Sequence, residues 1–96
     1  MITAKNIENL FKKQLDAIKD PGLREKVVAA WVEGCKIGGW KTVEELEKMP
    51  FTLLTETHGV SFIEHTVAVT EGALALARAQ TEHYRKMPYR IDFDRL

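Results

Sequence analysis

The sequence predicts an all-α protein: a helical bundle fragment of about four helices with one long central helix, forming a single domain over residues 1–96. Apolar residues recur at steps of three and four along most of the chain, as amphipathic helices require. Residues that cap helix starts precede these runs, and glycine or proline follows them. A chain of 96 residues has room for one hydrophobic core and for no second domain.

The first helix is expected to begin after Thr3 and to end near Lys19. Its apolar face carries Ile7, Leu10, Phe11, Leu15 and Ile18. Thr3 can accept hydrogen bonds from the first free amides, while Ile2 and Ile7 occupy the two positions of a hydrophobic staple. These residues fix where the helix begins.

The second helix is expected to begin at Pro21, directly after Asp20. Asp20 is a good N-cap, and proline is favoured at the first helical position because its missing N–H would have no partner there. One face of this helix carries Leu23, Val27, Trp31 and Cys35. The Gly38-Gly39 pair then releases the backbone and ends the helix.

A short third helix is expected after Thr42, because Glu45 follows three residues later as in a capping box. Pro50 closes this helix after barely two turns. No helical period persists over residues 51–60, where β-branched residues and a glycine indicate a loop.

The longest helix is expected to begin at Ser61, which forms a second capping box with Glu64, and to continue to about Lys86, before Pro88. Its middle carries small residues that would let a neighbouring helix approach closely: Ala68, Gly72, Ala75 and Ala79. Polar residues interrupt the apolar run, so the helix is not expected to span a membrane.

Composition limits the partners and the compartment. Lysine plus arginine and aspartate plus glutamate each number 14, so no net charge attracts nucleic acid or an anionic membrane. The single Cys35 has no partner for an internal disulfide, and residues 1–5 lack the apolar core of a signal peptide. We therefore predict a cytoplasmic protein that binds neither nucleic acid nor membrane.

His65 lies in the first turns of the long helix, and its neighbours at helical spacing are small or apolar, so we expect it to face the core. A histidine in a core needs only a hydrogen-bond partner for each polar nitrogen, and this structural role is one interpretation. A metal ligand is the other. His58 and His65 are seven residues apart, which does not match the His-Glu-x-x-His spacing of zinc metalloproteases.

The stretch from His58 to Thr70 reads HGVSFIEHTVAVT. It resembles the opening of the HD-domain metal-dependent phosphohydrolases, in which a loop leads into a helix bearing an apolar, Glu-His-Thr, apolar pattern. The resemblance implies that His65 is a metal ligand, joined by a His-Asp dyad on a following helix and by a late aspartate. It also implies a divalent metal ion whose bound water attacks a phosphoester such as a nucleotide.

The same resemblance implies a weaker role for His58, which lies in the loop ahead of Ser61 and could contact a substrate phosphate; the alternative is a merely exposed side chain. Gly59, Thr66 and Tyr84 follow the three histidines, so the sequence contains no His-Asp dyad. We therefore expect the N-terminal portion of a larger HD-type domain, inactive as an isolated chain. Residues 91–96 resemble a helix start, which suits that expectation or a frayed tail.

A different class of function is also open: a small helical self-association or protein-interaction module without catalysis. In that case His65 is structural, and apolar helix faces left exposed by a short core mediate contacts. A homo-oligomer is expected under either hypothesis. Tight stoichiometric metal that depends on His65 distinguishes the two.

Overall fold

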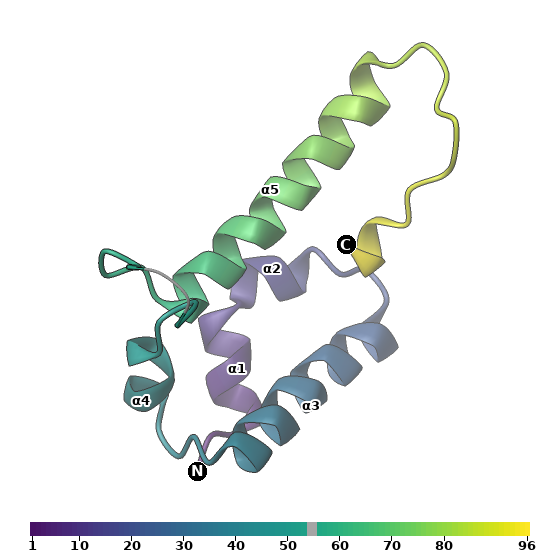
Figure 1. The fold of residues 1–96 in the computed structure, drawn as a ribbon. Coiled ribbons are helices and arrows are strands. Elements are labelled where there is room, and N and C mark those ends of the chain that lie inside the picture. The colour runs from purple at the N-terminus through teal and green to yellow at the C-terminus, as the bar shows by residue number, and fades with distance from the viewer. Residues whose placement is uncertain (54–55) are drawn as a thin grey trace.

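A computed structural model describes residues 1–53 and 56–96 and confirms the all-α class over them (Figure 1). The helices are α1 (Ala4–Leu10), α2 (Lys12–Asp16), α3 (Pro21–Gly38), α4 (Val43–Lys48) and α5 (Phe62–His83), followed by a 3-10 turn at Phe93–Arg95. In Figure 1 the first four helices gather around the start of α5, while the rest of α5 extends away from this body. The chain then returns to end near the connection between α2 and α3 (Figure 1).

The predicted start of the first helix is confirmed. The Thr3 hydroxyl accepts a hydrogen bond from the backbone amide of Asn6, and the Asn6 side chain accepts one from the backbone amide of Thr3. Ile2 and Ile7 are both buried, with 4% and 0% of their surface exposed, as a hydrophobic staple requires. The cap and the staple together anchor the N-terminus to the core.

The predicted continuous helix over residues 3–19 is instead two helices that meet at Phe11. Phe11 has φ −120° and ψ 30°, outside the helical values, although the amides of Phe11 and Leu15 still bond four residues back. The Phe11 ring is buried and lies 4.7 Å from the ring of Trp31 on α3. The apolar spacing is the same on both sides of the break, so periodicity could not locate it.

The core joins the first four helices to the first turn of α5. Its buried members are Ile2, Ile7, Phe11, Leu15, Val28, Cys35, Leu46 and Ile63. Trp31 links them, because its ring lies 4.7 Å from that of Phe11 and 5.9 Å from that of Phe62. This cluster holds α5 to the body at its N-terminal end.

Both predicted ends of the second helix are confirmed in α3. The Asp20 carboxylate accepts hydrogen bonds from the amides of Gly22 and Leu23. Gly39 adopts φ 80°, the left-handed conformation that favours glycine at a helix end. Local capping chemistry therefore sets the length of α3.

The capping boxes are formed to different degrees. At α5 the box is complete: Ser61 accepts from the amide of Glu64, and the Glu64 carboxylate accepts from the amide of Ser61. At α4, Thr42 accepts from the amide of Glu45, but the Glu45 carboxylate accepts from the amide of Lys41 instead. α5 ends at His83, three residues before the predicted end near Lys86.

The C-terminal segment is fixed to the connection between α2 and α3. The Asp94 carboxylate accepts hydrogen bonds from the backbone amides of Lys19, at 2.8 Å, and Asp20, at 3.0 Å. The bond from Lys19, more than that from Asp20, holds the pKa of Asp94 below its usual value. The helix start predicted for residues 91–96 is a single 3-10 turn, capped by Asp92, which accepts from the amide of Asp94.

Candidate functional site

His65 is exposed, so the expectation that it faces the core is wrong. The residues of α5 that are buried against the rest of the protein are Ile63, Leu74 and Ala77. At about 100° per residue, these lie on the opposite side of the helix from His65 and its small neighbours. Small apolar residues at helical spacing occur on packed and on exposed helix faces alike. Their pattern around His65 therefore could not show whether this side of α5 is buried.

The His65 ring stacks on Phe51, with ring centroids 4.6 Å apart and an interplanar angle of 25°. Neither ring nitrogen has a hydrogen-bond partner among residues 1–53 and 56–96. His58 is exposed on the preceding loop, with φ 51°, next to Gly59 with φ 84°. No ring contact or hydrogen bond joins His58 to His65 in the described part of the chain.

The described residues do not assemble a metal centre. No three histidine, cysteine, aspartate or glutamate side chains within residues 1–53 and 56–96 lie together as a metal requires. The Glu64 carboxylate, next to His65 in sequence, accepts a hydrogen bond from the backbone amide of Ser61. Burial raises the pKa of the Cys35 thiol, which keeps it protonated and disfavours a role as ligand or nucleophile. The ligand role of His65 and the substrate role of His58 stay predictions.

The side of α5 that carries His65 forms a second candidate surface, here named the outer face. Its apolar members are Ala68, Val69, Gly72, Ala75, Leu76 and Ala79, all exposed or nearly so. Val69 and Leu76 are the large ones, with 56% and 61% of their surface exposed. The small residues of this face, predicted from the sequence to pack against a neighbouring helix, are exposed instead.

Two opposite charges border the outer face. Glu71 forms an ion pair with Lys13 of α2, at 2.7 Å, and the hydrogen bond from Lys13 is the main reason that the pKa of Glu71 lies below its usual value. Arg78 lies seven residues further along the same edge and is exposed. No ion pair engages Arg78 within the described residues. Arg78 interacts electrostatically with Glu71, and its exposed side chain leaves room for a direct contact with an external partner.

A cleft of about 440 Å³ lies between α2, α3, α5 and the C-terminal turn. Its wall is mainly apolar and includes Trp31, Leu74 and Phe93. Two polar residues of α5, Thr66 and Thr70, also line the cleft. Their hydroxyl groups donate hydrogen bonds to backbone carbonyls of α5 itself. The sequence did not predict the cleft, because part of its wall is the C-terminal turn, which Asp94 joins to Lys19, 75 residues earlier.

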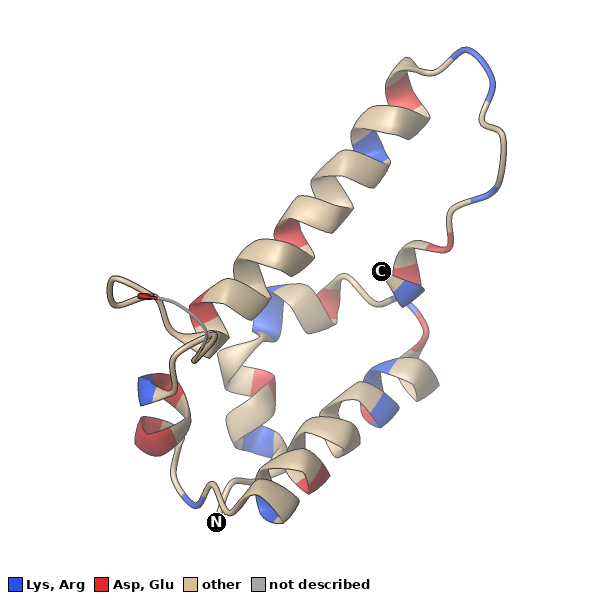
Figure 2. Ribbon diagram, in the orientation of Figure 1, with Lys and Arg blue, Asp and Glu red and all other residues tan. Residues whose placement is uncertain are grey.

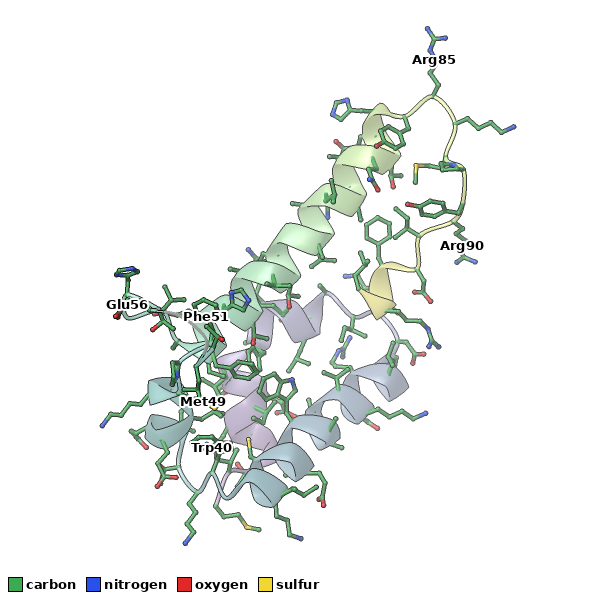
Figure 3. The ribbon with its side chains drawn as sticks, viewed as in Figure 1. Trp40, Met49, Phe51, Glu56, Arg85 and Arg90 are labelled. Atoms are coloured by element: carbon green, nitrogen blue, oxygen red, sulfur yellow. The ribbon has the colours of Figure 1, made fainter. Side chains whose placement is uncertain are left out.

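Charges are unevenly distributed along the molecule (Figure 2). Acidic residues gather on α4 and at the start of α5: Glu44, Glu45, Glu47 and Glu64. Basic residues lie beyond the far end of α5, on the loop that follows it. Figure 3 shows Arg85 and Arg90 pointing outward from this loop. Arg95, by contrast, pairs with Asp92 at 3.1 Å.

None of the helices in the part of the chain that the structure describes is long and apolar enough to cross a bilayer. No protein-family model matches the chain, and neither a curated protein nor a solved structure matches it.

Proposed function

We propose that this chain is a helical interaction module whose binding surface is the outer face of α5. The observation that carries the proposal is the exposure of Val69 and Leu76, at 56% and 61%, on one face with four small residues. Contiguous apolar surface rimmed by charged residues is typical of protein–protein contact sites. The small residues favour close approach of a second helix.

The way α5 is held supports the same proposal. This helix of 22 residues is buried at Ile63 near its start and at Leu74 and Ala77 in its middle. Its C-terminal end extends away from the other helices (Figure 1). Most helical stability in proteins comes from packing of an apolar face, so a second helix along the outer face would stabilise the projecting end of α5, residues 78–83.

Replacement of Leu76 by arginine tests whether the outer face of α5 mediates association. In the cells from which the protein comes, we expect the tagged chain to migrate as an assembly larger than a monomer, and the variant to return to monomer size. A guanidinium buried in an apolar contact lacks a counter-charge there, which disfavours association. Size-exclusion chromatography with light scattering measures the change.

Ile37→Arg is the matched control, because Ile37 is 79% exposed on α3, away from the outer face. It should leave the assembly intact, and circular dichroism should show equal helix content in both variants. Equal assembly sizes for wild type and Leu76→Arg would overturn the proposal.

A second candidate is the metal-ligand role of His65 in an HD-type phosphohydrolase acting on a phosphoester such as a nucleotide. It is favoured by the His65 ring, which is exposed and has no hydrogen bond to its nitrogens among the described residues. Metal centres of this kind take three or more protein ligands. The further ligands would come from outside the described residues or from another subunit.

Under this second hypothesis, His65→Ala should abolish stoichiometric binding of Mn²⁺ or Zn²⁺ by the assembled protein, measured by isothermal titration calorimetry. His83→Ala is the control, because His83 is equally exposed at the other end of α5. Metal bound equally by both variants would exclude His65 as a ligand.

A further inference from the structure

We infer that the partner of the outer face is a second copy of this chain, paired antiparallel along α5 about a two-fold axis between Gly72 and Ala75. The inference rests on the proposed function and names its partner. It follows from the order of small, apolar and charged residues around α5.

Outward residues of α5 recur at alternating steps of three and four, the spacing of a two-helix seam. They are His65, Ala68, Gly72, Ala75, Ala79 and Glu82, and all six are exposed. An antiparallel two-fold places Gly72 beside the partner's Ala75, and Ala68 beside the partner's Ala79. Both residues of each of these pairs are small, so the two helices can approach closely. The seam from His65 to Glu82 is about 26 Å long.

The ends of the seam are also complementary. The same axis places His65 beside the partner's Glu82, and Glu82 beside the partner's His65. An imidazole and a carboxylate can form a charge-assisted hydrogen bond when the histidine is protonated. In a parallel pair, each of these residues would instead meet its own copy.

The two edges of the seam differ in character. One edge carries Glu71 and Arg78, seven residues apart, and the other carries Val69 and Leu76, also seven apart. An antiparallel two-fold pairs each edge with the same edge of the partner. Glu71 then faces the partner's Arg78 and Val69 faces the partner's Leu76, and both contacts occur twice.

A parallel pair would be poorly matched, because its two-fold axis runs along the helices and brings the charged edge of each copy against the apolar edge of the other. Arg78, and Glu71 with its Lys13 partner, would then lie against the apolar edge of the other copy instead of meeting an opposite charge there. The larger charge distribution also favours the antiparallel pair. The basic loop after α5 of one copy would lie near the acidic start of α5 in the other (Figure 2).

Both charged groups of the predicted contact are accessible. The side chain of Glu71 is 32% exposed even with Lys13 bound to it, so it can accept from a second cation. Arg78 is exposed and has no ion pair among the described residues. The contact therefore adds a partner to each group without breaking the bond between Lys13 and Glu71.

Mixing two charge-reversal variants tests the arrangement. Arg78→Glu alone sets Glu71 against the partner's glutamate twice, and Glu71→Arg alone sets two arginines together twice. We expect each variant to raise the dimer dissociation constant at least about tenfold. In an equimolar mixture, each contact of the heterodimer joins opposite charges, so we expect dimers to return. Sedimentation equilibrium of the purified chains measures both effects.

The mixture also controls for loss of the bond between Lys13 and Glu71, because that loss persists when dimers return. Lys26→Glu makes the same charge change at an exposed site on α3 and should leave the wild-type dimer unchanged. A mixture that stays monomeric, or single variants that dimerise like wild type, would overturn the antiparallel pairing.

A purified wild-type chain that is monomeric at about 1 mM, where even weak interfaces associate, would also overturn the inference. The proposed module would stand in that case if the cellular assembly still depended on Leu76. An assembly insensitive to Leu76→Arg would instead remove the proposed function itself.

Discussion

Replacement of Ile7 by alanine is expected to lower the free energy of unfolding by about 3 kcal/mol, within the range for large-to-small changes in cores. Ile7 is completely buried and packs in the cluster that joins α1 to α3 and the start of α5. The change removes three methyl or methylene groups, leaves a cavity and weakens the staple with Ile2. Urea unfolding followed by circular dichroism measures the loss.

Ile37→Ala is the matched control, since it deletes the same atoms from a side chain that is 79% exposed on α3. We expect it to change the free energy of unfolding by about 0.5 kcal/mol or less, as surface substitutions do. Equal losses in the two variants would show that Ile7 is not packed as described.

The helix starts could be predicted from sequence because capping depends on residues within one turn of each other. Thr3, Asp20 and Ser61 each bind backbone amides two or three residues ahead, as their patterns indicated. The ends of α3 before Gly39 and of α4 before Pro50 are local in the same way. The all-α class followed from these signals and from the apolar spacing between them.

The direction in which α5 faces could not be predicted, because both of its sides are apolar. Ile63 and Leu74 lie on the packed side, and Val69 and Leu76 lie on the outer face. The spacing of apolar residues distinguishes the two faces of the helix, but it does not show which face packs against the rest of the protein. The small and apolar neighbours of His65 therefore predict a core position that the structure does not show, whereas its role as a metal ligand is implied only by the resemblance to HD-domain phosphohydrolases.

The C-terminal contacts were also beyond local patterns. Asp94 accepts hydrogen bonds from the amides of Lys19 and Asp20, more than 70 residues earlier, and the turn that carries Phe93 and Asp94 forms part of the cleft wall. The helix-start pattern at residues 91–96 is consistent with the capping role of Asp92, but no local pattern indicates the long-range partners of Asp94. Tertiary pairing of this kind leaves no spacing signal in the sequence.

Replacement of Leu46 by alanine is also expected to lower the free energy of unfolding by about 3 kcal/mol. The loss of structure should be concentrated in α4. α4 has six residues, too few for a helix to persist without tertiary packing. Leu46 is its single buried residue, with 1% of its surface exposed. Loss of this side chain should therefore release α4 from the core.

The release of α4 should reach the start of α5, because the Met49 carbonyl accepts a 2.7 Å hydrogen bond from the amide of Phe62. We expect faster amide exchange at Met49 and Phe62 in Leu46→Ala, measured by hydrogen–deuterium exchange with NMR detection. Leu53→Ala is the control, since Leu53 is 91% exposed. If α4 is held mainly by Leu46, exchange at Ile7 should change less than exchange at Met49. An equal increase in the exchange rates of the Ile7 and Met49 amides would instead mean that α4 and the core unfold as one unit.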